Sequence, residues 1–304
     1  MIYKNSMKLL TSNFKFVWKQ LAYTLVRVFI VVGLAAVVAN PILRALQDGG
    51  FYDNLKTVWE VIYTRTGSVF IEISHAFENF SRIIASNIST LLPFVLLFFV
   101  DVYFINSYLK NFGEYVLMDV ENNAYISLNN TGYCHSMVTK FTKASKYAFV
   151  KLLMCLPFDL MKVLFVYVYC CLFSNTIIAI VGIPIIIILN IVTESMQLSV
   201  YVGVAPSMIN MNANPFKSVF AVYKNQKGFL KIFGNAVIAV TTILFANTFI
   251  GVFTFGAGFL ITVPASMVLV STFKLLSYYY LMGQRYYLSP MIIVDPTNNN
   301  LSKD

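Results

Sequence analysis

The chain has 304 residues, of which 58% are hydrophobic and only 12% are charged, and its mean hydropathy is +0.72. Soluble domains carry about a quarter charged residues, so this chain lacks the residues to cover a water-facing surface. The composition excludes an ordinary soluble enzyme and a disordered protein. It also excludes a nucleic-acid-binding module, despite a net charge of +9. We therefore expect an all-α integral membrane protein.

Six apolar stretches reach the length of about 20 residues that a helix needs to cross a bilayer. They cover residues 20–43, 89–112, 150–173, 176–204, 231–252 and 257–283. The third and fourth stretches are separated by two residues, Ser174 and Asn175. This close spacing predicts a tight helix hairpin.

Lysines gather before the first, third and fifth apolar stretches, whereas acidic residues outnumber basic ones in the segment 44–82. Loops rich in Lys and Arg stay on the cytoplasmic side of a membrane. With six crossings, all the lysine groups fall on one side, which places both termini in the cytoplasm. Abundant Tyr, Phe and Asn with two Trp are typical of an AT-rich bacterial genome, so we expect a multi-pass protein of the bacterial cell membrane.

An internal repeat organises the chain into three tandem two-helix units within a single membrane domain, 1–304. The units cover about 8–123, 136–214 and 215–299. Each returning helix carries a proline followed about ten residues later by an ionisable residue, and then by Met and Asn. The pairs are Pro93 with Asp101, Pro184 with Glu194, and Pro264 with Lys274. We expect these prolines, together with Pro157, to kink their helices.

Two polar segments lie outside the apolar stretches. In the extracytoplasmic segment 46–88, apolar residues recur at helical spacing on both sides of Thr66-Gly67. This pattern predicts two short amphipathic helices that lie on the outer leaflet or cap the bundle. The tail 295–304 is short, polar and rich in Asn, which predicts disorder.

The segment Pro157-Phe158-Asp159-Leu160-Met161-Lys162 resembles the Pro-X-Asp/Glu-X-X-Lys/Arg signature of the mitochondrial carrier family. In that family the signature kinks an odd-numbered helix and supplies a gating salt bridge. The first and fifth predicted helices here lack it, so we interpret the match as coincidental. In the arrangement of its repeats, most of the chain resembles uncharacterised bacterial multi-pass domains with proline-containing helices and basic connectors. This resemblance implies no activity.

Six ionisable residues fall within the predicted membrane helices, three basic and three acidic: Arg27, Asp101, Asp159, Lys162, Glu194 and Lys274. An unpaired charge at that depth costs several kcal/mol, so a balanced set predicts mutual pairing. Asp159 and Lys162 can pair along one helix face, and Asp101 and Lys274 hold matching places in their repeat units. The set fits either structural ion pairs that hold helices together or a substrate or ion pathway.

The basic connectors alternate lysines with aromatic residues, including Phe141, Tyr147 and Phe149. We interpret them as interfacial helices that contact the anionic cytoplasmic leaflet, where each lysine contributes about 1 kcal/mol. Lipid anchoring is favoured over recruitment of a partner. The lipid-facing lysines are Lys140, Lys143, Lys146, Lys217, Lys224 and Lys227.

No motif nominates a catalytic, cofactor or metal site. The four Cys and two His lack metal-ligand spacing, and phosphate-binding and nucleophile motifs are missing. Asp119 and Glu121, close to Asn122, are interpreted as a solvated acidic turn. We expect a non-enzymatic scaffold or accessory factor of a membrane system, with a possible membrane-protein partner. The alternative is a small-solute or ion transporter that uses the intramembrane charges.

Overall fold

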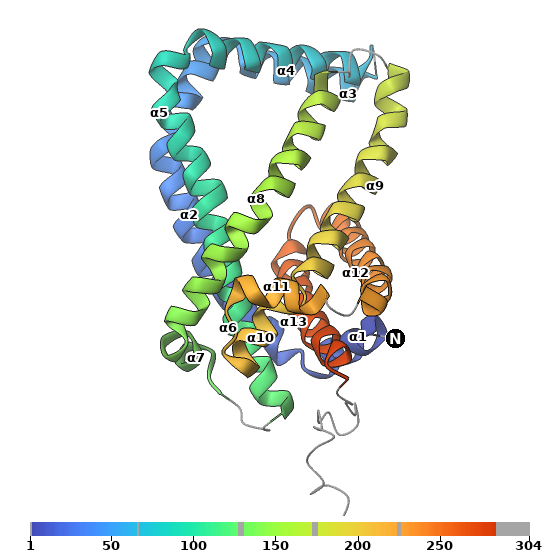
Figure 1. The fold of residues 1–304 in the computed structure, drawn as a ribbon. Helices are drawn as coiled ribbons and strands as arrows, with labels where there is room; N and C mark the ends of the chain where they lie inside the picture. The colour runs from blue at the N-terminus through green and yellow to red at the C-terminus, as the bar shows by residue number, and fades with distance from the viewer. Residues whose placement is uncertain (1, 66, 127–130, 172–175, 224–225, 284–304) are drawn as a thin grey trace, which may run out of the picture. The chain divides into compact units, whose positions relative to one another are not determined.

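The structure, a computed structural model, describes residues 2–65, 67–126, 131–171, 176–223 and 226–283. All regular structure within these ranges is helical (Figure 1), which confirms the predicted all-α class. The chain divides into two compact units. Unit 1 comprises Met1–Arg27, Ser107–Cys155 and Ile191–Asp304, and unit 2 comprises Val28–Asn106 and Leu156–Asn190.

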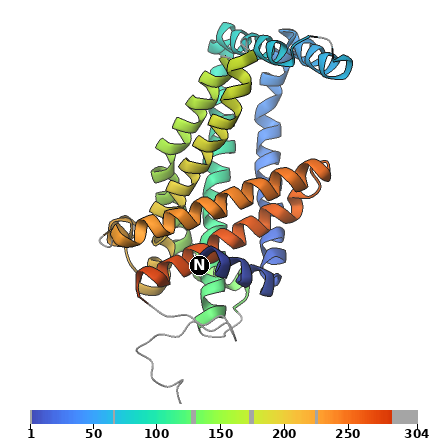
Figure 2. The same ribbon diagram turned by 90° about the vertical axis from the view of Figure 1, so that its right-hand side faces the viewer.

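Unit 1 is built around a helical hairpin. In it, α12 and α13 run side by side in opposite directions, and the N-terminal helix α1 packs on both (Figure 2). Three long helices contribute one end each to this unit: α2 (Lys15–Asp48), α8 (Phe141–Cys171) and α9 (Thr176–Val200). Its other helices are α1 (Ile2–Ser12), α6 (Asn106–Ile126), α7 (Tyr133–Thr139), α10 (Val204–Met211), α11 (Pro215–Tyr223), α12 (Gln226–Phe253) and α13 (Phe259–Leu281).

The turn between α12 and α13 is closed by local backbone geometry. Gly256 has φ +88, a conformation that costs glycine little and other residues much. The Gly256 N–H donates to the carbonyl of Gly251 at 2.8 Å, and the Gly258 N–H donates to the Thr254 hydroxyl at 2.7 Å. These bonds satisfy polar groups at the ends of both helices.

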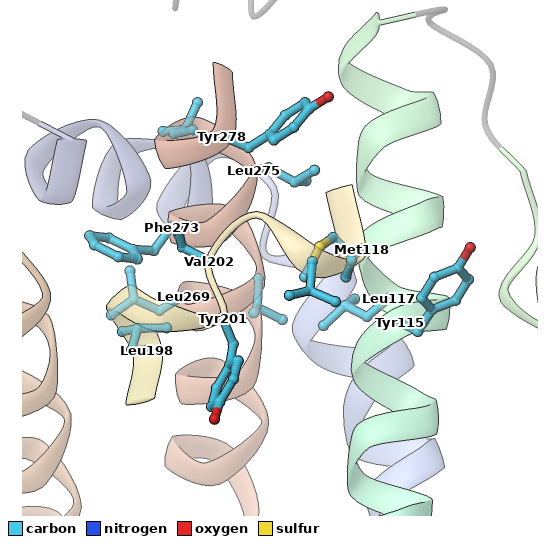
Figure 3. Close-up of a cluster of buried hydrophobic side chains, with 14 of the residues drawn as sticks. Tyr115, Leu117, Met118, Leu198, Tyr201, Val202, Leu269, Phe273, Leu275 and Tyr278 are labelled. Carbon is cyan, nitrogen blue, oxygen red and sulfur yellow. The ribbon is translucent and has the colours of Figure 1, made fainter. Parts of the chain in front are cut away.

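The core of unit 1 draws large apolar side chains from several helices (Figure 3). Tyr115, Leu117 and Met118 come from α6, whereas Phe273 and Leu275 come from α13. Half of the apolar stretch of α13 is buried, compared with 6% of that of α2. Because α13 touches α1, α10 and α12, it is the central helix of this unit.

Unit 2 contains α3 (Phe51–Thr64), α4 (Val69–Ser86), α5 (Ile88–Phe99) and a π-helical segment, η1 (Val100–Ile105), together with the remaining parts of α2, α8 and α9. The helices α3 and α4 pack against each other, and the rings of Phe51 and Phe80 lie 5.6 Å apart. Between these helices, Arg65 and Gly67 adopt positive φ angles. The two short helices predicted for segment 46–88 are therefore confirmed.

Five helical segments of the described chain are long and apolar enough to cross a membrane: Lys15–Asp48, Ile88–Tyr125, Val181–Met211, Gly228–Phe253 and Phe259–Leu281. They correspond to five of the six predicted stretches and are compatible with a multi-pass membrane protein. The remaining stretch, 150–173, falls on α8, which is not among the five. It runs into residues 172–175, which lie outside the described residues together with the predicted hairpin at Ser174-Asn175.

Each proline expected to kink a helix lies inside one. Pro93 is in α5, Pro157 in α8, Pro184 in α9 and Pro264 in α13. The predicted tail 295–304 and the end of the third repeat unit lie outside the described residues.

Candidate functional site

A buried ion cluster joins three helices of unit 1. The carboxylate of Glu114, on α6, accepts from Lys151 Nζ on α8 at 2.5 Å and from Lys274 Nζ on α13. The side chains of Glu114 and Lys274 are 6% and 3% exposed, and that of Lys151 is 14% exposed. One carboxylate therefore faces two ammonium groups in a nearly dry site. Loss of the Glu114 charge would leave two ammonium groups buried without a counter-charge, which is costly.

Tyr147 completes the cluster from the same face of α8 as Lys151, one helical turn away. Its hydroxyl donates to Glu114 at 3.0 Å, and its ring is fully buried. The phenol is the donor in this bond, because a carboxylate oxygen can only accept. Tyr147 was expected to face the lipid interface, and that interpretation is wrong.

Asp101 and Lys274 hold matching places in the predicted repeat units, and Lys151 lies at the start of the third apolar stretch. The structure gives Lys274 a different carboxylate, Glu114, and places Lys151 against that same carboxylate. Glu114 was not among the predicted site residues. Its two lysine partners are 37 and 160 positions away in sequence, so no local spacing reveals them.

Further polar side chains of α6 are buried one to two turns beyond Glu114. The Glu121 carboxylate is fully buried and contacts the hydroxyls of Ser271 and Thr272 at 2.6 and 3.3 Å. The Asp119 carboxylate accepts from the Ser136 hydroxyl at 2.6 Å. The predicted solvated turn at Asp119 and Glu121 is therefore wrong, because these residues lie inside a helix and carry hydroxyl partners from α7 and α13.

Asn122 extends this line of buried polar groups. Its side-chain oxygen accepts from the Tyr279 hydroxyl on α13, and its side-chain nitrogen donates to Asn210 on α10 at 3.1 Å. Because the polar face of α6 is bonded to α7, α8, α10 and α13, these contacts fix the rotation of α6 within unit 1.

Arg27 lies at the edge of unit 1, on α2. Its Nε and Nη1 atoms are buried and have no hydrogen-bond partner among the described residues. Nearby, the Tyr23 hydroxyl donates to the Leu109 carbonyl at 2.6 Å, and the rings of Tyr23 and Tyr133 lie 5.8 Å apart. Among the described residues, the structure thus places Arg27 beside aromatic side chains and not beside a carboxylate.

The pair predicted within α8 is present in unit 2. Lys162 Nζ lies 3.1 Å from the Asp159 carboxylate, and the Tyr103 hydroxyl donates to the other oxygen of that carboxylate at 2.9 Å. The pair is partly exposed, so it contributes at most about 1 kcal/mol to stability. Tyr103 belongs to η1 and therefore links the π-helical segment to α8.

Asp101 lies in the same π-helical segment and is 3% exposed. Neither of its carboxylate oxygens has a hydrogen-bond partner within the described part of the chain. π-Helical segments occur mostly as single turns and are frequent at functional sites. A buried carboxylate without a partner is costly unless it is protonated or binds a cation.

The other predicted residues are spread over the surface of unit 1. Glu194 is half-buried on α9, Lys146 and Lys217 are exposed, and Lys140 is half-buried at the end of α7. Lys143 donates to Asn212. Lys224 and the side chain of Lys227 lie outside the described residues.

Unit 2 holds a cavity of about 530 Å³ where α2 ends and α4 meets α5. Ile83 of α4 and Leu91 of α5 line it and are buried. The lining also includes polar and charged side chains: Asn40, Arg44, Asp48, Ser86, Asn87 and Thr90. Sequence reasoning did not single out these residues, because each is unremarkable on its own helix.

Comparison with known proteins finds no matching family model, no matching curated protein and no matching solved structure. Within the described ranges, no group of three or more His, Cys, Asp or Glu side chains is placed to hold a metal ion. The function of the chain must therefore be argued from the sites described above.

Proposed function

We propose that the chain crosses a bacterial cell membrane six times, with both termini in the cytoplasm. Five apolar helices of sufficient length support the membrane assignment, and the lysine-rich connectors support the orientation. The sixth crossing would be α8, whose charged residues Asp159 and Lys162 pair with each other. The three tandem two-helix units belong to the same proposal, supported by a proline in the first half of each returning segment.

We propose further that the protein is a non-enzymatic scaffold or accessory factor of a membrane system. The observation that carries this proposal is the position of Lys274. Its ammonium group is buried against Glu114 beside Lys151, so the charges of this cluster hold helices together. Buried ion clusters of this kind specify which elements pack, and their charge is dispensable when apolar groups of similar volume replace all members.

Two surfaces of unit 1 are candidates for partners, one apolar and one basic. On α12, the exposed rings of Phe245, Phe249 and Phe253 form a continuous row, with centroids 6.5 and 4.4 Å apart. Exposed Lys146 and Lys217 suit an anionic leaflet. We propose that lipid covers the basic surface and that another membrane protein docks on the aromatic row of α12.

The test is crosslinking in the native membrane followed by purification of the full chain and identification of what it carries. A defined membrane protein should be recovered in fixed ratio with the wild type and lost with Phe245→Ala/Phe249→Ala. A matched control, Val32→Ala/Val37→Ala, removes exposed apolar side chains from α2 and should leave recovery unchanged. Recovery of lipid alone with the wild type would contradict a scaffold, and equal recovery with both variants would contradict docking on α12.

A second candidate function, transport of an ion or small solute, is favoured by Asp101. A buried carboxylate without a partner among the described residues, on a π-helical segment, is typical of a cation or proton pathway. Flux of protons, Na⁺ or K⁺ into vesicles that contain the purified protein tests this candidate. Flux with the wild type that Asp101→Asn abolishes would establish transport. Flux no greater than in protein-free vesicles would exclude transport of these ions.

A further inference from the structure

The cavity of unit 2 presents uncommitted polar side chains of both charge signs. Asn40, Arg44 and Asp48 are spaced four residues apart on α2, so they lie along one helix face. Within the described part of the chain, Arg44 and Asp48 form no ion pair with each other or with a third residue. A guanidinium, a carboxylate and an amide therefore line one cavity, and none of these side chains is hydrogen-bonded to another described residue.

The cavity lies where the end of α2 approaches α4 and α5. Ile83 on α4 and Leu91 on α5 line it and are buried. The Asn79 side-chain nitrogen on α4 donates to the Gly49 carbonyl just after α2 at 3.3 Å, which connects the end of α2 to α4. The cavity volume of about 530 Å³ lies in the range of small-ligand pockets.

The two charges discriminate between classes of ligand. A guanidinium binds phosphate oxygens through paired hydrogen bonds. A carboxylate repels a purely anionic group but attracts an ammonium. The combination of Arg44 and Asp48 therefore suits a ligand that carries a phosphate ester and an ammonium close together, and phosphoethanolamine is the simplest such group.

Apolar side chains continue from the cavity along both lining membrane helices. On α2, Val37 lies one turn before Pro41 and is 77% exposed, and on α5, Leu92 and Leu96 are also exposed. These residues would contact acyl chains, whereas a soluble zwitterion would leave them without a partner. This continuity favours a lipid as the source of the headgroup.

We propose that this cavity binds the headgroup of a zwitterionic glycerophospholipid, with its phosphate on Arg44 and its ammonium on Asp48. The proposal rests on the membrane assignment above but on neither candidate activity. It requires the headgroup to lie at the membrane surface next to the end of α2, in whichever leaflet that end occupies.

The test is native mass spectrometry of the purified full chain, titrated with phosphatidylethanolamine or phosphatidylglycerol of identical acyl chains. The wild type should bind one phosphatidylethanolamine about fivefold more tightly than phosphatidylglycerol, a ratio in the range of exposed ion pairs. Arg44→Gln should weaken binding of both lipids, because both carry the phosphate. Asp48→Asn should weaken binding of phosphatidylethanolamine alone and so remove the preference.

Matched controls come from the same unit. Arg82→Gln on α4 and Asp53→Asn on α3 change the same residue types at exposed positions outside the cavity, and they should leave binding of both lipids unchanged. Arg44 and Asp48 are exposed, so their variants should keep the wild-type unfolding temperature. This comparison separates loss of the site from loss of the fold.

Equal affinity of the wild type for the two lipids would overturn the proposal, as would unchanged binding in Arg44→Gln. Free phosphoethanolamine provides the third arm of the experiment. If it binds as tightly as the lipid, the site serves a soluble ligand and the lipid proposal is wrong. Failure of these lipid tests leaves the capture experiment on α12 unaffected, so the two proposals fail separately.

Discussion

Lys151 Nζ lies 2.5 Å from one carboxylate oxygen of Glu114, and the other oxygen of the same carboxylate contacts Lys274. A single acidic side chain on α6 thereby ties α8 and α13 together inside unit 1. The energetic value of this arrangement depends on which group is removed, because burial makes an unpaired charge far more costly than a missing pair.

Glu114→Gln should strongly destabilise the protein. The substitution keeps the shape of the side chain but leaves two ammonium groups buried without a counter-charge, which costs about 3–5 kcal/mol. The measurement is the unfolding temperature of the purified protein in detergent. The control is Lys146→Gln, an exposed position on α8, which should leave that temperature unchanged. An unfolding temperature of Glu114→Gln equal to the wild type would contradict the assigned role of the cluster.

Gly113→Ala should destabilise unit 1 by about 1–3 kcal/mol, the range for overpacking a filled core. A methyl group at this position would collide with the Tyr23 ring, which is held by its hydrogen bond to Leu109 and by contact with Tyr133. Denaturation of the purified variant measures the effect.

Gly234→Ala on α12 supplies the contrast, because nothing lies within 4 Å of the added group. It should stabilise the helix by about 0.5–1 kcal/mol, since alanine restricts the unfolded chain more than glycine. If the two alanine variants change stability alike, the contact at Gly113 does not restrain the packing of α6.

Tyr103→Phe should lower stability by about 1 kcal/mol, the net value of one hydrogen bond. The substitution removes the donor to Asp159 but leaves the ion pair with Lys162 in place. A double-mutant cycle with Asp159→Asn measures the coupling between the two side chains. Additive effects of the two substitutions would show that the bond between η1 and α8 contributes nothing to the fold.

The orientation of the chain can be read from a native cysteine. Cys134 is exposed at the start of α7, in the connector proposed to be cytoplasmic. With Cys155, Cys170 and Cys171 replaced by Ser, a membrane-impermeant maleimide should label Cys134 in inverted vesicles and not in intact cells. Thr57→Cys on α3, combined with Cys134→Ser, should show the opposite pattern. Labelling of both positions from one side would contradict the proposed topology.

The sequence predicted features that depend on residues close together in the chain. It missed contacts between residues that are far apart in the chain. Apolar length predicted five of the helices now seen, and helical periodicity predicted α3 and α4, because both signals depend on neighbouring residues. The Asp159–Lys162 pair followed from its spacing of three residues. Glu114 was missed because its partners come from other helices.

The position of Lys151 on α8 shows which sequence signal could have predicted its burial. It resembles Lys146 in the basic connector, yet it lies one turn from Tyr147, close to the small residues Ala144 and Ala148 on the same part of α8. Ala144, Tyr147 and Ala148 are fully buried, whereas Lys146 and Phe149 are exposed. The helical phase of α8 could have separated Lys151 from the lipid-facing lysines, but its carboxylate partner required the tertiary fold.

The most direct test of the account replaces the whole cluster in one variant, Glu114→Met/Tyr147→Phe/Lys151→Met/Lys274→Met. If the charges only hold helices together, the apolar set should keep the unfolding temperature near that of the wild type, well above that of Glu114→Gln. The same purified variant should still recover the membrane-protein partner after crosslinking. A variant that keeps its unfolding temperature but loses that partner would contradict the account, because the charges would then serve the function and not the fold.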